Sequence, residues 1–137
     1  MIESISAVTL ATHDMGRAVR FYRTLGFELL YGGVDAQFTS LRAGTGYLNL
    51  IAQPAERRWS WWGRVIFHVS DVDAVYARAV ELGATGLRPP EDQFYGDRAA
   101  QIQDPFGHRW SLQAPIEDVS QAELERRAAE GGYTTEP

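Results

Sequence analysis

The chain has 137 residues, 45% of them hydrophobic, a formal net charge of −5 and no cysteine. This composition supplies enough apolar surface for one compact domain, and it excludes disulfides, thiolate nucleophiles and sulfur-ligated metals. The negative charge argues against nucleic acid as a partner, and the absence of lysine excludes lysine base chemistry. No apolar run reaches the roughly 20 residues that span a bilayer. Because the N-terminus lacks the basic start of a signal peptide, we expect a cytoplasmic protein.

Two copies of one sequence pattern occupy the chain, at a constant offset and without a gap. Each copy begins with a strand-like stretch rich in β-branched residues, at 6–12 and again at 65–70. Asp14 and Asp71 follow, where each is expected to cap the N-terminus of an amphipathic helix. A Leu-Gly pair then ends each helix, because glycine adopts the left-handed conformation that helix C-termini favour.

Three further strands are predicted after each helix, at 27–33, 36–43 and 46–53 and again at 83–90, 98–104 and 109–114, with a tight DPFG turn at 104–107. The order is therefore β-α-β-β-β, twice. The expected fold class is α+β, with two βαβββ modules forming an open barrel-like sheet with a cleft, plus a C-terminal helix.

We expect one structural domain overall, with four segments along the chain. The two modules cover 1–53 and 64–115, a Trp/Arg-rich connection covers 54–63, and a C-terminal helix and tail cover 116–137. Ser120 begins this last helix in the spacing of a capping box.

The duplicated unit, with AVRFYRTLGFEL early and DPFGHRW late, resembles the vicinal-oxygen-chelate superfamily. That superfamily includes glyoxalase I, extradiol dioxygenases, fosfomycin resistance enzymes and bleomycin resistance proteins. The resemblance covers about residues 4–114 and is closest to the PhnB-like and bleomycin-resistance-like branches. It implies the fold described above and a homodimer, whereas the function is less constrained, because one fold hosts many activities.

In enzymes of this superfamily a divalent metal is held by residues from the first and last strand of each half. The corresponding positions in this chain hold Ala7, Asn49, Arg64 and Ser111. None of these is a usual ligand of zinc, iron or manganese, and Arg64 would repel a cation. The resemblance therefore implies a chain without the usual metal site, and we expect no cofactor.

Strand alternation places the residues that share the parity of these four positions on one face of each sheet. These residues mix small apolar side chains with hydrogen-bonding groups, as small-molecule pockets do. They are Ala7, Thr9, Ala11, Tyr47, Asn49, Ile51, Arg64, Ile66, His68, Arg109, Ser111 and Gln113. The alternative is a closed core, which the cost of burying unpaired charge disfavours.

His68 is the candidate catalytic residue, as a general base or an orienting donor, although a structural histidine is the hypothesis we favour. Arg64 and Arg109 are candidate clamps for a carboxylate or phosphate. Alternatively, they pair with acids of the chain itself, such as Asp104 and Glu28.

The connection contains the segment RRWSWWGR, with Trp59, Trp61 and Trp62 almost side by side. If the next strand already runs here, Trp62 shares the face of Arg64 and forms a wall for a flat ring, while the other two point away. The alternative, which we favour for the cluster as a whole, is that these residues fill the boundary between the two halves, or a dimer interface.

We therefore expect a metal-free protein that binds or sequesters a small, partly aromatic molecule, without nucleic acid or membrane partners. Phe94 and Tyr95 join the candidates because long loops beside a cleft often contribute to binding. The full ligand-binding set is Asn49, Tyr47, Trp62, Arg64, His68, Phe94, Tyr95, Arg109 and Ser111. The charge of the ligand stays open, because the net charge suits a cation and the arginines suit an anion.

Two alternatives remain. The first is an enzyme of the same superfamily, namely a lyase, isomerase or dioxygenase that uses unconventional metal ligands or His68 as a general base. The second is a module that binds a protein partner through the tryptophan face, which would expose a large apolar patch.

Overall fold

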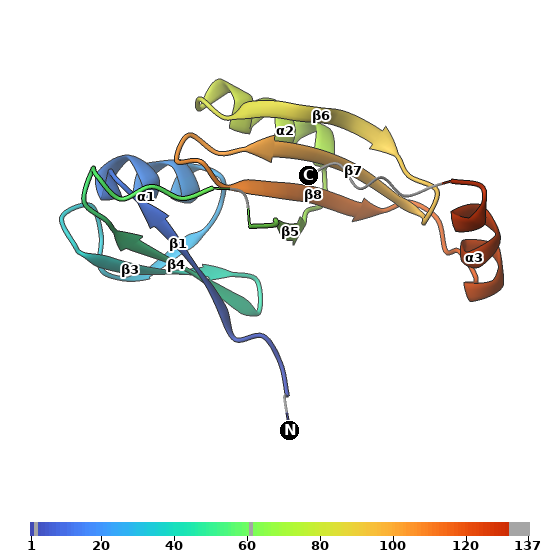
Figure 1. The fold of residues 1–137 in the computed structure, drawn as a ribbon, viewed down its shortest axis with the longest axis horizontal. Helices are drawn as coiled ribbons and strands as arrows, with labels where there is room; N and C mark the ends of the chain where they lie inside the picture. Colours follow the sequence, from blue (N-terminus) through green and yellow to red (C-terminus); the bar gives the residue numbers. More distant parts are fainter. Residues whose placement is uncertain (2, 61, 132–137) are drawn as a thin grey trace. The chain divides into compact units, whose positions relative to one another are not determined.

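The computed structural model describes residue 1, residues 3–60 and residues 62–131 (Figure 1). The chain divides into two compact units, Met1–Trp59 and Ser60–Pro137. Each unit contains a four-stranded sheet, and both sheets are open. The predicted α+β class, with two βαβββ modules and a C-terminal helix, is confirmed.

The first unit follows the predicted order of elements, which are β1 (Ala7–Thr12), α1 (Met15–Thr24), β2 (Glu28–Tyr31), β3 (Phe38–Ala43) and β4 (Gly46–Ala52). The strand order in the sheet is β1-β4-β3-β2. β1 and β4 are parallel, whereas β3 is antiparallel to both of its neighbours.

Alternation along β4 separates the two faces of the first sheet. Leu48 and Leu50 are buried on the side that α1 covers, whereas Tyr47 and Ile51 are exposed. The predicted helix cap is confirmed, because the Asp14 carboxylate accepts the backbone N–H of Arg17 at 3.0 Å. The chain leaves α1 through Gly26, whose φ of 107° is the left-handed conformation that was predicted.

The second unit repeats the pattern with β5 (Val65–His68), α2 (Val72–Glu81), β6 (Thr85–Asp92), β7 (Asp97–Gln103) and β8 (Arg109–Pro115), and adds α3 (Gln121–Ala129). The strand order is β5-β8-β7-β6, with β5 and β8 parallel. α2 packs against β6, β7 and β8, while α3 lies beyond the ends of the strands (Figure 1).

The core of the second unit lies between the sheet and α2. Trp110 and Leu112 of β8 and Ile102 of β7 are almost completely buried there. Phe67 of β5 meets the Trp110 ring edge-on, with ring centroids 5.2 Å apart. Asp71 caps α2 as predicted, by accepting the backbone N–H of Ala74 at 3.0 Å.

The predicted DPFG turn is confirmed, and Asp104 closes it. The buried carboxylate accepts the backbone N–H groups of Phe106 at 3.0 Å and His108 at 2.8 Å. The backbone N–H of Gly107 also donates to the Asp104 carbonyl at 3.2 Å. Asp104 therefore positions the start of β8, because two backbone donors of the turn depend on its carboxylate.

Two expectations from the sequence are corrected by the structure. β5 begins at Val65, where the strand was predicted, so the strand does not already run at Trp62, which was the condition for placing Trp62 beside Arg64. β6 runs from Thr85 to Asp92 and carries two register shifts against β7. These shifts change which β6 side chains face each side of the sheet.

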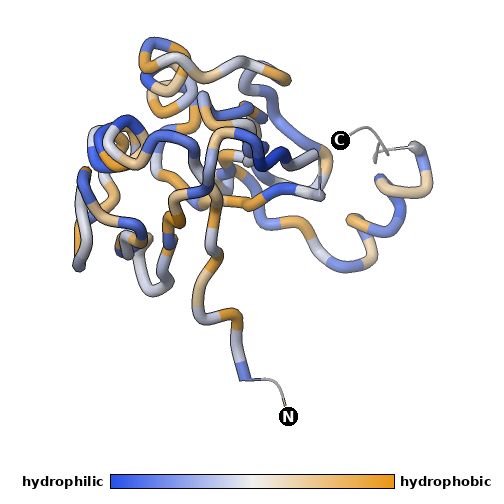
Figure 2. The backbone as a smooth tube through the Cα atoms, turned by 60° about the vertical axis from the view of Figure 1, so that its left-hand side comes forward, coloured by the Kyte–Doolittle hydropathy of each residue, from blue (hydrophilic) through white to orange (hydrophobic). Residues whose placement is uncertain are grey.

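Hydrophobic residues occur in short segments among hydrophilic ones along the part of the chain that the structure describes (Figure 2). Among the described residues, no helix has the length and apolar character needed to cross a membrane.

Candidate functional site

The face of the second sheet opposite the buried core carries a concavity of about 780 Å³, called here the sheet pocket. Its polar lining comes from β6, β7, β8, the β6–β7 loop and the residue before β5, namely Arg64, Arg88, Glu91, Gln93, Asp97, Gln101, Ser111 and Gln113. Its apolar and aromatic lining consists of Ile66, Leu87, Pro89, Phe94, Tyr95, Ala99, Ala100 and Leu124. Pockets for small organic ligands commonly have this size and mixture.

Strand register arranges the middle of the sheet pocket as one row across the sheet. Ile66 of β5 pairs with Ser111 of β8, Ser111 pairs with Gln101 of β7, and Gln101 pairs with Arg88 of β6. Neighbouring strands are about 4.8 Å apart, so adjacent side chains of the row can hold one ligand together. Ser111 is only 1% exposed, and its hydroxyl makes no hydrogen bond to any described residue.

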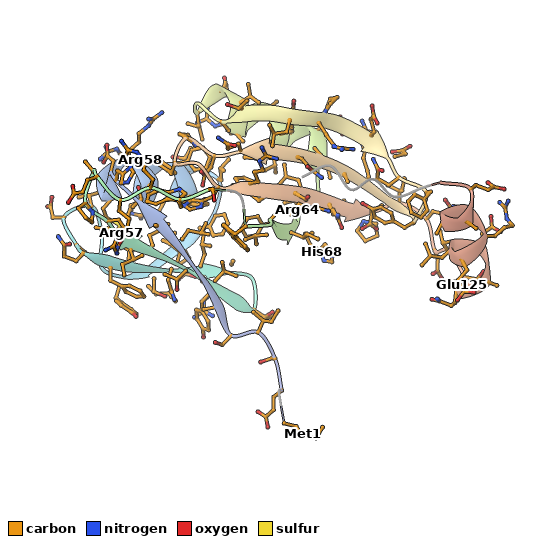
Figure 3. All side chains as sticks on the ribbon, viewed as in Figure 1. Met1, Arg57, Arg58, Arg64, His68 and Glu125 are labelled. Atoms are coloured by element: carbon orange, nitrogen blue, oxygen red, sulfur yellow. The ribbon has the colours of Figure 1, made fainter. Side chains whose placement is uncertain are left out.

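β5 positions two of the predicted site residues. Arg64 directly precedes this strand and His68 ends it, and both are exposed (Figure 3). Arg64 lines the sheet pocket, whereas His68 does not, although it pairs with the lining residue Gln113 in the sheet register. The structure therefore brings Arg64 to the sheet pocket and leaves the candidate base at its edge.

The β6–β7 loop supplies the aromatic end of the sheet pocket. Phe94 and Tyr95 both line it, and their rings pack edge-to-face with centroids 5.2 Å apart. The Gln113 side-chain amide donates to the Tyr95 hydroxyl at 3.3 Å. This contact fixes the Tyr95 ring against β8, so the loop presents a defined aromatic surface.

α3 borders the same end of the pocket, which the sequence had not indicated. Leu124 is a lining residue. Arg127 donates to the Phe94 carbonyl at 2.9 Å and to the carboxylates of Glu117 and Glu123, each at 2.9 Å. Arg127 therefore ties α3 both to the aromatic loop and to the segment that follows β8.

Hydrogen bonds from arginines at α3 lower the pKa values of two nearby carboxyl groups. Hydrogen bonds from Arg126 and then Arg127 lower the pKa of Glu123 to about 2. The hydrogen bond from Arg127 also lowers the pKa of Glu117. Glu123 therefore remains charged, and bound to its arginines, well into the acidic range, and the pKa of Glu117 is shifted in the same direction.

The first unit holds the candidates Asn49 and Tyr47. The Asn49 amide donates to the Thr9 hydroxyl at 3.4 Å, and Tyr47 is 41% exposed beneath the guanidinium of Arg42. Arg42 also pairs with Glu28 at 3.6 Å. Glu28, which was suggested as a partner for Arg64 or Arg109, therefore forms its ion pair with Arg42.

The remaining candidates lie outside the sheet pocket. Trp62 is 56% exposed and does not line it, and neither does Arg109, at the start of β8. Trp59 packs on His13, with ring centroids 4.4 Å apart, while His13 Nε2 is hydrogen-bonded to the Arg57 carbonyl at 2.7 Å. Trp61 lies outside the described residues.

The residues at the usual metal positions do not fit a metal ion. Ala7 offers no ligand atom, Arg64 is a cation, and Asn49 offers only a neutral amide oxygen, which is not a usual ligand of zinc, iron or manganese. Ser111 offers only a neutral hydroxyl, a poor ligand for zinc or iron. Across the part of the chain that the structure describes, no three His, Cys, Asp or Glu side chains cluster in a way that could hold a metal.

Comparison with known families agrees with this fold. Residues 4–112 match the family model of the Glyoxalase/Bleomycin resistance protein/Dioxygenase superfamily. The chain therefore belongs to this superfamily.

Three relatives illustrate the similarity. An uncharacterized protein of Mycobacterium bovis is 44% identical over 64 residues, which are 47% of this chain and 42% of that protein, so the match spans less than half of its length. An uncharacterized protein of Mycolicibacterium smegmatis is 30% identical over 115 residues, 82% of this chain and 94% of that protein. The crystal structure of TioX from Micromonospora sp. ML1 is 30% identical with a TM-score of 0.65, over 83% of this chain and all of TioX.

Lowering the pH should release α3 from the aromatic loop. The folded pKa of Glu123 is depressed from 4.5 to about 2. The contribution of its ion pairs is therefore complete above about pH 4.5 and lost as the pH falls toward 2. NMR signals of Leu124 and Phe94 should shift across this window, and Glu123→Gln should show the shifted positions already at neutral pH. Identical Leu124 signals at pH 5 and pH 2 would contradict this coupling.

Replacing Gly96 by alanine should disturb the aromatic end of the pocket. Gly96 has a φ of 97°, and an added Cβ would overlap the Glu117 carbonyl oxygen and approach Val119 Cγ2 to 2.9 Å. The matched control is Gly26→Ala, where φ is 107° but no atom lies within 4 Å of the added Cβ. The control measures the left-handed strain alone, about 1–2 kcal/mol.

Urea unfolding should show a larger loss of stability for Gly96→Ala than for Gly26→Ala, because the backbone clash adds to the strain. NMR signals of Tyr95 should also move only in the Gly96 variant. Equal losses in the two variants would show that the contact with the Glu117 carbonyl does not constrain the loop.

Proposed function

We propose that this protein binds or sequesters a small organic molecule, aromatic in part, in the sheet pocket without using a metal ion. The observation that carries the proposal is the combination of a concavity of about 780 Å³ with the Ser111 hydroxyl, which lines it and makes no hydrogen bond to any described residue. Such a hydroxyl can both donate a hydrogen bond to a ligand and accept one from it.

The α3 end and the middle of the sheet pocket together support a ligand with an apolar part and a polar part. Phe94 and Leu124 offer apolar contact at the α3 end, and the Tyr95 ring is held in place by Gln113. Polar side chains such as Gln101 line the middle. This division resembles organic-ligand sites, in which apolar walls supply affinity and a few polar groups fix orientation.

The chemistry of the donors supports a function that does not require a metal. Arg64 stands at one family metal position and Ser111 at another, and both line the sheet pocket. A permanent guanidinium charge at this face opposes binding of a divalent cation. The homodimer, the cytoplasmic location and the lack of nucleic acid or membrane partners remain part of this proposal.

An enzymatic function within the superfamily is the second candidate, and the exposure of His68 at the end of β5 favours it. In that case His68 acts as a general base on a ligand that extends beyond the sheet pocket. His68→Gln would then abolish turnover and leave ligand affinity and folding intact, which separates this candidate from binding alone.

Shortening the apolar wall should weaken ligand binding. A panel of aromatic acids, phenols and amines is titrated against the whole chain, with affinities measured by NMR shifts. For the compounds that bind, Phe94→Ala should reduce affinity roughly tenfold to a hundredfold, because an aromatic contact contributes about 1.5–3 kcal/mol.

Val80→Ala is the matched control, since Val80 is an exposed residue of α2 outside the sheet pocket. It should leave every affinity unchanged. The proposal fails if bound compounds shift only signals outside the sheet pocket, or if both variants weaken binding equally.

A further inference from the structure

The arginines of the second unit separate into two groups. Arg78, Arg98, Arg126 and Arg127 each pair with carboxylates of the chain, at 2.6–3.0 Å. The guanidinium groups of Arg64, Arg88 and Arg109 make no ion pair or hydrogen bond with any described residue. All three belong to the face of the sheet that carries the sheet pocket, and Arg64 and Arg88 line it.

Carboxylates line the same pocket as Arg64 and Arg88 but do not pair with them. Glu91 and Asp97 also line the sheet pocket, yet neither carboxylate pairs with an arginine of the described chain. Arg98, by contrast, binds both Asp73 and Asp92, with donor–acceptor distances of 2.7–2.9 Å. The side chains of Arg64 and Arg88 are therefore available to an anion from outside the chain.

The middle row of the sheet pocket presents further donors beside Arg88. Arg88 is next to Gln101 in the sheet register, and Gln101 is next to Ser111. The side chains of Gln101 and Ser111 have no hydrogen-bond partner among the described residues, and only 1% of Ser111 is exposed. The row thus offers a guanidinium, an amide N–H and a hydroxyl within reach of one group.

From this arrangement we infer that Arg88, Gln101 and Ser111, together with Arg64, bind an oxyanion, a carboxylate or a phosphate, of the molecule that occupies the sheet pocket. This inference rests on the proposed function and adds the chemical class of the ligand. Guanidinium groups bind carboxylates and phosphates through charge-assisted hydrogen bonds, and the hydroxyl and amide can donate to the same oxygens.

The rest of the lining determines how the ligand lies. With its oxyanion over the middle row, the ligand directs its apolar part toward Phe94 and Leu124. Glu91 and Asp97 line the pocket as well and repel a second anionic group. The preferred ligand therefore carries one oxyanion and an apolar or aromatic body. A positive charge on that body is compatible with the two acids.

The inference also gives a physical role to the replaced metal positions. Arg64 and Ser111 stand where the resemblance places metal ligands, and both now contribute to a surface that attracts an anion. A fixed guanidinium supplies positive charge for an oxyanion without any bound ion.

The test measures three probes that share a benzene ring: phenyl phosphate, benzoate and benzyl alcohol. Each is titrated into the whole chain by calorimetry and by NMR. Both oxyanions should shift the Gln101 side-chain amide and the Arg88 Nε–H signals, and benzyl alcohol should bind at least tenfold more weakly than the better oxyanion. Comparison of phenyl phosphate with benzoate distinguishes a phosphate from a carboxylate ligand.

Arg88→Gln should weaken oxyanion binding roughly tenfold to a hundredfold, because it removes a charge-assisted contact. The matched control Arg78→Gln makes the same change of charge on α2, where Arg78 pairs with Glu81 at 3.0 Å, and should leave affinity within about twofold. Raising the salt concentration should weaken oxyanion binding to the unaltered protein and have less effect in Arg88→Gln.

Three results would overturn the oxyanion site. In the first, benzyl alcohol binds the pocket as tightly as benzoate and Arg88→Gln changes neither, so the proposed pocket stands and its ligand is not anionic. In the second, the oxyanions shift only signals outside the sheet pocket. In the third, no oxyanion binds at millimolar concentration. The titration with the wider aromatic panel then tests the proposed function separately.

Discussion

The alternation of β8 is the constraint on which the site depends. Trp110 and Leu112 are held in the core beneath α2, with about 1% of each exposed. Successive strand residues point to opposite faces, so Ser111 and Gln113 must face the sheet pocket. A shift of β8 by one residue would place tryptophan and leucine at the pocket and serine in the core, and the Asp104 turn at the start of the strand opposes such a shift.

Much of this arrangement follows from local sequence signals. The caps Asp14 and Asp71 and the duplicated pattern predicted both βαβββ units, because a cap, a helix period and a Leu-Gly stop act within a few residues. Strand parity then placed Arg64 and Ser111 on one face, where both line the sheet pocket. Such periodic signals can be read without knowing any tertiary contact.

Other parts of the site were not predicted, because they depend on contacts between segments that are distant in the sequence. Arg88 was missed because the register shifts of β6 break the simple alternation of that strand. Leu124 was missed because α3 is attached by the contacts of Arg127 with Glu117 and the Phe94 carbonyl, which leave no periodic pattern in the sequence. The proposed role of Trp62 required a strand that in fact begins only at Val65.

The central claim is that the sheet pocket binds its ligand without a metal ion, and metal analysis of the purified chain tests it most directly. The protein is incubated with zinc, iron, manganese, nickel and magnesium in turn, desalted, and measured by elemental analysis. The account predicts far less than one metal ion per chain in every case, because Arg64 and Ser111 replace the usual ligands. One tightly bound metal ion per chain would contradict it and would favour the enzymatic candidate.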